Sequence, residues 1–510
     1  MGLGLAERIE AVFALDANSH AMEFKGRWHT WGEIGSVMAQ VEGYLAQAAL
    51  PKGTPVGVLL RNRPAHVAAL LQVLVSHRCV VTINPFQGAD KLADDLRKIR
   101  APALIAASED LEIPQIRAAL EDIGSLTIAL DSKDELQVRG ILPMAEAPAI
   151  PFHEPLPGTC ILMLTSGTTG PAKRIKLPYR NFERALLDAA HYEQSRDPNS
   201  RLKLKTAVAV INTPLVHIGG MYAAVDSIVS ARPISILEKF SVDEWQRTML
   251  AYRPKLVSLP PTAIRMVFDA DVPKDVLASL LAIRTGSAPL DTELQHRFES
   301  KYGVPILDTY GATEFAGAVA GWTLRDHREF GNAKRGSVGR AQPGCELRIV
   351  NLETGEPHVP GTVGLLEVRS PQIDAKAWLR TTDLAEIDSD GFLFIRGRAD
   401  DAIIRGGFKV LPIDIETVLR RHPSVKEACV VGLPEARLGA VPVAAVEQSA
   451  DSPAVSGDDL IAFARNHLVA YQVPVRIEVV DTLPRTPSLK ISRYEVKNLF
   501  EALPASKAPD

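Results

Sequence analysis

The sequence has no surplus of positive charge. Its 510 residues contain 57 Lys and Arg against 61 Asp and Glu, which gives a formal net charge of −4. Proteins that follow the phosphates of nucleic acids, or the anionic surface of a membrane, carry clustered excess Lys and Arg. The charge balance therefore argues against a nucleic-acid binder and against a protein held on membranes by charge.

Cysteine is scarce. Cys79, Cys160, Cys345 and Cys429 lie far apart in the chain and form no C-x-x-C pair. This spacing provides neither a zinc signature nor a disulfide framework. We expect a protein of a reducing compartment, for which the cytoplasm fits best.

Long hydrophobic runs are also missing. The N-terminal segment carries Glu7, Arg8 and Glu10 where a signal peptide needs an uninterrupted apolar core, so it predicts an amphipathic helix. Elsewhere Arg, His or Asn interrupts the apolar stretches, well short of the roughly 18 residues needed to span a bilayer. The sequence predicts no transmembrane segment.

Short β-branched runs alternate with helical patterns from about residue 55 to 390, as in VGVLL, AHVAALLQVLVSH and CVVTIN. Such alternation indicates parallel βαβ units. Hairpin-like strands follow from about Gly336, and then a compact unit with a turn at Gly406-Gly407 and a helix beginning at Pro412. We predict an α/β fold in which residues 1–399 form layered α/β sheets plus a β-rich subdomain. Residues 400–510 form a small, mobile α+β domain.

Residues 161–177 read ILMLTSGTTGPAKRIKL, an apolar strand followed by glycines and small hydroxylated residues. Consecutive N–H groups and hydroxyls suit a polyphosphate, with a lysine as counter-charge, although a surface turn is the alternative. A Walker A loop is excluded because, counted from Gly167, it needs Gly at Ala172 and Ser or Thr at Arg174. The predicted phosphate-binding residues are Thr165, Ser166, Gly167, Thr168, Thr169, Gly170 and Lys173.

Six further motifs follow in order: NTPLVHIGG (212–220), TGSAPL (285–290), DTYGATE (308–314), WLRTTD (378–383), GRADDAIIRGGFKVLPIDIE (397–416) and PRTPSLK (484–490). With TSGTTGPAK they resemble the signature of the adenylate-forming superfamily, in its branch of fatty and aromatic acyl-CoA synthetases. The resemblance covers almost the whole chain. It implies that a small carboxylic acid reacts with ATP and Mg²⁺ to give acyl-AMP and pyrophosphate. Coenzyme A then gives acyl-CoA and AMP.

The resemblance also assigns roles in the large domain. Thr313 contacts the α-phosphate and Glu314 offers Mg²⁺ a hard carboxylate oxygen, whereas a helix N-cap is the alternative for this pair. Tyr310 offers an aromatic face to adenine, although such a residue alone would more often lie in a core. The backbone on the adenine side is provided by Gly286, Ser287, Ala288 and Gly311.

In the second half of the chain, Asp383 resembles the ribose-binding carboxylate and Arg398 the arginine that contacts ribose and phosphate. Their alternatives are a turn residue and a surface ion pair. Lys490 resembles the catalytic lysine, because a cation that touches both reacting groups offsets their like-charge repulsion. Asp400 resembles the hinge between the two half-reactions. Gly406 and Gly407 leave room for the pantetheine arm of coenzyme A.

His217 resembles a gate residue between the acyl pocket and the thiol tunnel, with a core histidine as the alternative. Residues 216–220 offer no carboxylate for a substrate ammonium, so a plain carboxylic acid is favoured over an amino acid. The small and apolar residues of VHIGGMYAAV, SLPPT and TGSAP suggest an aromatic, alicyclic or medium-chain acid.

Four residues depart from the family pattern: Ala172 replaces Pro, and Arg174, Thr382 and Leu489 replace Gly. None removes a side chain that takes part in the chemistry. Two rival functions stay open. One is a ligase that loads a carrier protein, and the other is a catalytically silent acyl-nucleotide sensor. A homodimer is compatible with the sequence, which does not determine the oligomeric state.

Overall fold

The computed structural model describes residues 3–131, 136–146, 148–165, 173–188, 202–449, 452–486 and 489–502. The chain forms two compact units. The large unit contains the described residues of Met1–Thr165, Lys173–Cys345 and Ser370–Lys376. The small unit contains those of Glu346–Arg369 and Ala377–Asp510.

A seven-stranded sheet dominates the first part of the large unit, in the order β7-β6-β5-β3-β4-β8-β9. Five of these strands run parallel: β3 (Pro55–Leu59), β4 (Cys79–Ile83), β5 (Ala103–Ala107), β6 (Leu126–Asp131) and β8 (Thr159–Thr165). The antiparallel edges are β7 (Gln137–Leu142) and β9 (Lys173–Pro178). Every residue of β3, β4 and β5 is buried, which is typical of parallel strands covered on both faces.

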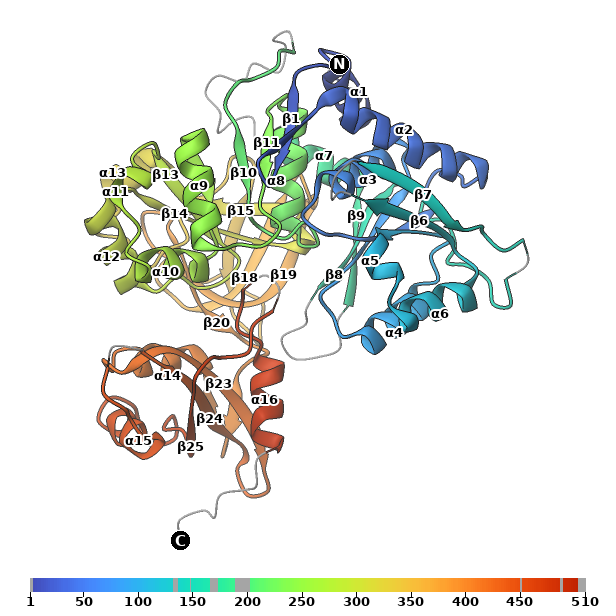
Figure 1. The fold of residues 1–510 in the computed structure, drawn as a ribbon. Helices are drawn as coiled ribbons and strands as arrows, with labels where there is room; N and C mark the ends of the chain where they lie inside the picture. Colours follow the sequence, from blue (N-terminus) through green and yellow to red (C-terminus); the bar gives the residue numbers. More distant parts are fainter. Residues whose placement is uncertain are drawn as a thin grey trace. The chain divides into compact units, whose positions relative to one another are not determined.

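Helices cover both faces of this sheet (Figure 1). One hydrophobic core joins alternate strand residues such as Val56 and Val58 to three helices: α1 (Leu5–Phe13), α2 (Trp31–Gln47) and α3 (Pro64–Val75). A second core joins Leu59 and Val81 to α4 (Ala89–Ile99) and α6 (Pro114–Ile123), which pack side by side. The short helix α5 (Ser108–Leu111) precedes α6. Because side chains alternate between the two faces of a strand, neighbouring residues of these strands point into different cores.

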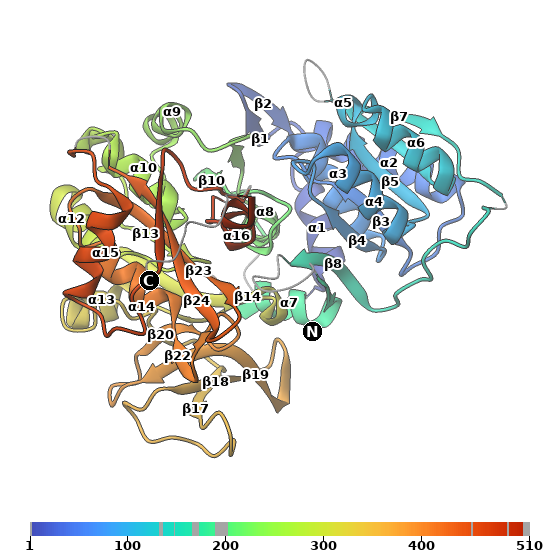
Figure 2. The same cartoon turned by 90° about the horizontal axis from the view of Figure 1, so that it is seen from below.

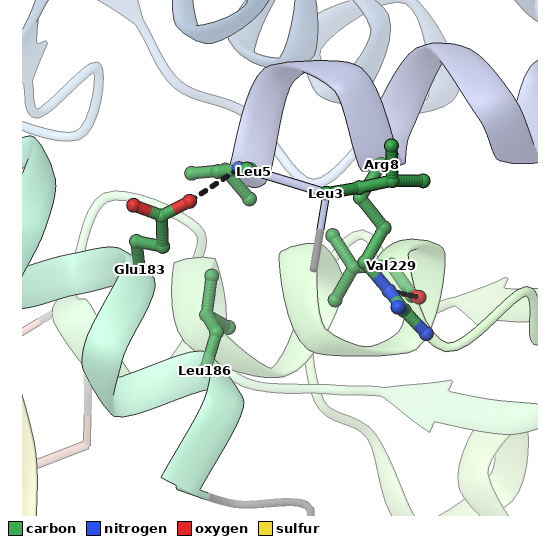
Figure 3. A pocket seen from close by; sticks show the side chains of 7 residues that line it. Leu3, Leu5, Arg8, Glu183, Leu186 and Val229 are labelled. Carbon is green, nitrogen blue, oxygen red and sulfur yellow. Dashed lines mark hydrogen bonds between the residues drawn. The ribbon is translucent and has the colours of Figure 1, made fainter. Parts of the chain in front are cut away.

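The predicted amphipathic helix at the N-terminus is confirmed as α1. Glu183 lies on α7 (Tyr179–Asp188), and its Oε1 accepts a hydrogen bond from the Leu5 N–H at 2.6 Å (Figure 3). The Arg8 Nε donates to the Val229 carbonyl at 2.7 Å. Glu183 therefore satisfies one of the N–H groups that the start of a helix leaves without an intrahelical partner.

Two smaller sheets complete the large unit. The first has the order β10-β11-β1-β2: β10 (Ala209–Ile211), β11 (Ile234–Ile236), β1 (His20–Phe24) and β2 (Arg27–Thr30). The second has the order β12-β13-β14-β15-β16: β12 (Leu256–Ser258), β13 (Ala282–Gly286), β14 (Ile306–Ala312), β15 (Gly317–Gly321) and β16 (Arg340–Ala341). The connecting helices are α8 (Ile218–Val229), α9 (Val242–Tyr252), α10 (Pro261–Asp269), α11 (Lys274–Leu277), α12 (Thr292–Tyr302) and α13 (Leu324–Phe330).

The small unit has two sheets. The first has the order β17-β18-β19-β20: β17 (Glu346–Val350), β18 (Gly364–Ser370), β19 (Asp374–Ile387) and β20 (Leu393–Arg398). The second has the order β22-β21-β24-β23, with β25 paired to β24: β21 (Ile403–Arg405), β22 (Phe408–Val410), β23 (Val425–Glu435), β24 (Gly439–Gln448) and β25 (Arg476–Val480).

Helices again lie on both faces of the second of these sheets (Figure 1 and Figure 2). Val430 points to a core that includes α14 (Pro412–Leu419) and α15 (Gly457–Arg465). Its neighbour Val431 points to a core that includes α16 (Arg493–Ala502). The predicted turn at Gly406-Gly407 and the predicted helix start at Pro412 are confirmed.

The mixed α/β architecture is confirmed, whereas the compact units are divided differently from the predicted domains. Residues 346–369 and 377–399 belong to the small unit, although the sequence-based boundary places them before it. The predicted boundary at Asp400 concerns a point of rotation and stays a prediction. None of the four cysteines, all of which lie in the described ranges, forms a disulfide bond. Within the described ranges, no helix has the length and apolar composition to cross a membrane.

Candidate functional site

The predicted phosphate loop lies between β8 and β9. Ser166, Gly167, Thr168, Thr169 and Gly170 lie outside the described residues. The two ends of the loop are adjacent, because Thr165 and Lys173 are partners in the antiparallel β8–β9 ladder, and Lys173 is exposed. Lys173, the predicted counter-charge for the phosphates, is therefore the first residue of β9. Its partner Thr165 is the last residue of β8, from which the loop starts.

Arg174, which replaces a glycine of the family pattern, is held by the neighbouring chain. Its Nη2 pairs with Asp95 Oδ2 at 2.7 Å, and its Nη1 donates to the Thr82 carbonyl at 3.0 Å. The charge of Arg174 is thus matched within the large unit. Arg174, in place of the family's glycine, thus ties the edge strand β9 to its neighbours in the large unit.

The DTYGATE motif forms strand β14 and the 3₁₀ turn η2 (Thr313–Phe315). The residue at the N-cap of this turn is Ala312, and no side chain caps it, so the capping alternative is wrong for Thr313, whereas Glu314 does lie in the first turn. Thr313 and Tyr310 are half-buried, and the ring centroids of Tyr310 and Phe315 are 6.1 Å apart. The exposed Glu314 carboxylate makes no hydrogen bond or ion pair within the described part of the chain.

The adenine-side segment begins where β13 ends. Gly286 is paired in register with Thr309 of the parallel strand β14. A Cβ atom on Gly286 would lie 2.6 Å from Thr309 Oγ1, so strand packing by itself requires glycine here. Likewise, a Cβ atom on Gly311 would lie 2.5 Å from the Gly317 carbonyl oxygen. Both glycines therefore have a packing reason that is independent of a nucleotide.

Ser287 follows with a φ of 67°, in the left-handed region that favours glycine. It is exposed, and Ala288 after it is half-buried. Non-glycine residues in this conformation cost free energy and concentrate at functional sites. The backbone just after β13 is therefore strained at Ser287, within the segment predicted to contact adenine.

Asp308 is a buried carboxyl in the same motif that the sequence did not single out. Its side chain is 9% exposed. Among the described residues, the hydrogen bond to its carboxylate comes from the Thr309 N–H at 2.8 Å. Burial raises the pKa of Asp308 to about 7, against an ordinary value of 3.8, because desolvation disfavours the charged form. The Asp308 carboxyl group is therefore expected to change its protonation state near neutral pH.

Replacing Asp308 with asparagine should stabilise the protein at alkaline pH. The pKa of Asp308 is raised on folding, so stability falls as pH rises between the unfolded value of 3.8 and about 7. Asparagine has a similar shape and no charge to bury. We expect Asp308→Asn to gain about 1–4 kcal/mol of unfolding free energy at pH 8, and the gain to vanish towards pH 4. Thermal unfolding of both proteins across this range measures it, and a pH-independent difference would contradict the assignment.

The segment that leads into the predicted acyl-pocket residues 216–225 is held by Asn62, another residue that the sequence did not reveal. The buried Asn62 side chain donates to the carbonyls of Thr213 and Leu237, each at 3.1 Å, and accepts from the Leu215 N–H at 2.8 Å. These three bonds join positions more than 150 residues apart in the chain. A side-chain amide that satisfies a loop in this way holds the loop in one shape.

His217 occupies the N-cap position of α8 and is half-buried. Two glycines follow it with different surroundings. A Cβ atom on Gly220 would lie 2.3 Å from the Pro214 carbonyl oxygen, whereas one on Gly219 would meet nothing within 4 Å. Gly220 is thus required by packing. Gly219 is exposed and leaves open space beside the start of the helix.

Asp383 and Arg398 of the small unit are brought together, because they are partners in the antiparallel β19–β20 ladder. The Arg398 guanidinium pairs with both carboxylate oxygens of Asp400, at 2.9 and 2.8 Å. It also donates to Thr382 Oγ1 at 2.6 Å. Thr382, a departure from the family pattern, therefore contributes its hydroxyl to the surroundings of Arg398. The ion-pair alternative for Arg398 is present and involves the predicted hinge residue itself.

Gly406 and Gly407 connect β21 to β22 with φ of 56° and 87°. Two successive positive φ angles are typical of a two-residue hairpin turn and favour glycine. A Cβ atom on Gly407 would meet nothing within 4 Å, so the surface of this turn is open. Both residues therefore have a conformational reason to be glycine, but only Gly407 has free space, since a Cβ atom on Gly406 would lie 3.2 Å from Leu438 Cδ2.

Lys490 lies in the loop before α16 and is half-buried. Burial lowers the pKa of Lys490 below its usual 10.5. Its ammonium makes no hydrogen bond or ion pair among the described residues. Leu489, which replaces the glycine of the family pattern, has a φ of 64° in the left-handed region.

No group of three or more His, Cys, Asp or Glu side chains that could hold a metal ion is present in the described ranges. The exposed and unpaired Glu314 carboxylate nevertheless fits Mg²⁺. This ion is commonly bound by one or two carboxylates, with substrate phosphates and waters completing its octahedron.

Comparisons with known proteins agree with these motifs. The model of the AMP-binding enzyme family matches residues 9–375, and that of the AMP-binding enzyme C-terminal domain matches residues 414–490. A 2-succinylbenzoate–CoA ligase of Bacillus pumilus is 28% identical over 501 residues, or 94% of each chain. A 4-coumarate–CoA ligase-like protein of Oryza sativa is 29% identical, over 84% of this chain and 75% of that one. The structure of ATP-bound MatB from Rhodopseudomonas palustris has the same fold, with a TM-score of 0.82, 22% identity, and coverage of 98% of this chain and 99% of that chain.

Proposed function

Because the chain belongs to the family of AMP-binding enzymes, it is an AMP-forming acid–thiol ligase, and we propose that its substrate is an aromatic, alicyclic or medium-chain carboxylic acid. The observation that carries this proposal is that both family models match, in the expected order, on one chain. Relatives matched over nearly their whole length are named as CoA ligases, including those for 2-succinylbenzoate and 4-coumarate.

The first step joins the substrate carboxylate to the α-phosphate of ATP and releases pyrophosphate. Both reacting groups are negatively charged, so catalysis requires positioning and a cation rather than a side-chain nucleophile. We assign the cation to Lys490 and the α-phosphate contact to Thr313. Glu314 would hold Mg²⁺, which neutralises phosphate charge when it is bound. Asp383 and Arg398 hold the ribose, and Tyr310 with Gly286, Ser287, Ala288 and Gly311 holds adenine.

In the second step the thiol of coenzyme A attacks the acyl-adenylate carbonyl and AMP leaves. We assign the passage of the pantetheine arm to the open turn at Gly406 and Gly407. His217 is proposed to separate the acyl pocket from the thiol. The proposed partners are therefore a small carboxylic acid, ATP, Mg²⁺ and coenzyme A.

A panel of carboxylic acids, scored by AMP release with coenzyme A present, tests the proposed substrate class. Aromatic, alicyclic and medium-chain acids should exceed acetate and amino acids. A parallel assay that offers a holo carrier protein in place of coenzyme A separates the two thiol acceptors. Absence of acid-dependent pyrophosphate exchange with every acid would instead favour the acyl-nucleotide sensor.

Acid selection should change when Gly219 is enlarged. A Cβ atom at residue 219 would meet nothing within 4 Å, so a larger side chain can begin there, and a leucine would reduce the room proposed for the acyl group. We expect Gly219→Leu to weaken the kcat/KM of large acids by about one to three kcal/mol more than that of short acids. The ratio of the two kcat/KM values measures this effect, with Gly219→Ala as the control. An unchanged ratio would remove this segment from the pocket.

A further inference from the structure

Two arginines flank Lys490 in the sequence, and each pairs with a buried glutamate. Arg485 Nη2 lies 3.2 Å from Glu447 Oε2, and Arg493 Nη2 lies 2.8 Å from Glu416 Oε1. Each glutamate side chain is 6% exposed. The two pairs thus hold the chain five residues before and three residues after the predicted catalytic lysine.

Both glutamates are fixed by further partners. Glu447 accepts a hydrogen bond from the Leu483 N–H at 3.1 Å and pairs with Lys426 Nζ at 3.0 Å. Glu416, on α14, accepts from the Val430 N–H at 2.9 Å. A buried carboxylate with several hydrogen bonds has little freedom to move. Each arginine therefore binds to a point that is rigid relative to the sheet.

The segment between the arginines is closed by the backbone. Arg485 and Ile491 form an antiparallel bridge, and the Ser492 N–H donates to the Pro484 carbonyl at 2.8 Å. The Thr486 N–H donates to the Lys490 carbonyl at 2.7 Å. These bonds place Lys490 on a closed loop whose two stems are the residues next to the arginines.

The ammonium of Lys490 makes no hydrogen bond or ion pair among the described residues, so no polar contact of its side chain with them fixes its position. The position is set by the backbone of the loop, and hence by what holds the stems. A buried ion pair is weak evidence for stability, because replacing it with apolar residues is often neutral or stabilising. The two ion pairs lie one on each stem of the same loop. Their arrangement therefore indicates that they fix the position of the loop.

We propose that the ion pairs Arg485–Glu447 and Arg493–Glu416 position Lys490 for the adenylation step. They act through the loop and touch no substrate, so the four residues are positioning residues. The inference rests on the proposed role of Lys490. A misplacement of about 1 Å can reduce the rate of a positioned reaction on the order of 10²-fold.

The test is Arg485→Gln, with Arg485→Lys as the conservative variant. We expect Arg485→Gln to lower the kcat of acid-dependent pyrophosphate exchange roughly 10–100-fold, while the KM for ATP changes by less than about threefold. Formation of acyl-CoA from isolated acyl-adenylate should stay within about threefold of the parent. Arg485→Lys keeps the charge and should regain much of the exchange rate.

Arg476→Gln is the matched control. Arg476 lies on β25 of the same unit, is 18% exposed against 19% for Arg485, and pairs with Glu478 at 2.6 Å. Its loss should leave the ratio of the two half-reactions unchanged. Where Arg485→Gln does not stay folded in a thermal unfolding assay, Arg493→Gln on the other stem gives the same measurement, with Arg493→Lys as its conservative variant.

Equal losses in both half-reactions, the same split in Arg476→Gln, or parental exchange in Arg485→Gln would overturn the inference. Its failure can be distinguished from failure of the proposed function. If the parent lacks acid-dependent exchange, the function is wrong. If exchange depends on Lys490 but not on Arg485 or Arg493, only the positioning role is wrong.

Discussion

Lys490→Ala is expected to lower acid-dependent pyrophosphate exchange roughly 10²–10³-fold, or by about 3–4 kcal/mol, in line with the loss of one preorganised electrostatic contact. The expected effect is large because adenylation brings a carboxylate against a negatively charged phosphate. Attack of a thiol on a finished acyl-adenylate has no such repulsion to overcome. Formation of acyl-CoA from isolated acyl-adenylate should therefore change much less.

Two controls sharpen this experiment. Lys497→Ala removes an exposed lysine of α16 near Glu501 and should leave both half-reactions unchanged. The pH profile is the second control. Burial lowers the pKa of Lys490, so the parent should lose exchange activity as pH rises, with a midpoint below the usual 10.5. Equal losses of both half-reactions in Lys490→Ala would remove this residue from its assigned role.

Asp400→Pro is expected to separate the half-reactions in the opposite sense. Proline fixes φ near −65°, so a hinge residue replaced by proline can no longer undergo a large change of φ. We expect exchange to stay within about tenfold of the parent and acyl-CoA formation from isolated acyl-adenylate to be largely abolished. Both rates and the melting temperature are measured on the same preparation.

The ion pair between Asp400 and Arg398 requires a matched variant, because proline also removes the carboxylate. Asp400→Ala removes the same carboxylate and leaves φ free. If Asp400→Ala retains acyl-CoA formation while Asp400→Pro loses it, the loss is due to the backbone. A proline variant that stays folded and makes acyl-CoA at the parental rate would exclude the hinge. Equal loss in both variants would assign the effect to Arg398.

Local patterns explain which parts of the fold could be predicted. The apolar runs at β3 and β4 are predictable from the sequence because every residue of a covered parallel strand is buried. Strand β24 gives no such signal, since it contains Pro442 and three alanine residues, which are depleted in strands. Its burial comes from its place between β21 and β23, which no local pattern reveals.

The residues of the candidate site likewise fall into those that the sequence predicts and those that it does not. Motif order was sufficient to propose Glu314, Asp383 and Lys490, whose assigned roles stay predictions. Asn62 and Glu447 were missed because their partners lie far away in the sequence, and a single buried amide or carboxylate leaves no local signal. Asp308 was visible as a carboxyl in an apolar strand, which is a signal for a shifted pKa.

The left-handed conformation of Leu489 affects how the loop behaves as an ensemble. A leucine in this region is less stable than a glycine by about 1–2 kcal/mol, so the described shape of the loop is disfavoured by that amount. Other shapes, in which residue 489 adopts an ordinary φ, gain population by a factor of roughly 5–30 relative to a loop that contains glycine. Relative to a chain with glycine at residue 489, the equilibrium is thus shifted away from the described position of Lys490. With Lys490 in the role proposed for it, such a shift would lower the share of molecules whose loop is preset in the described shape.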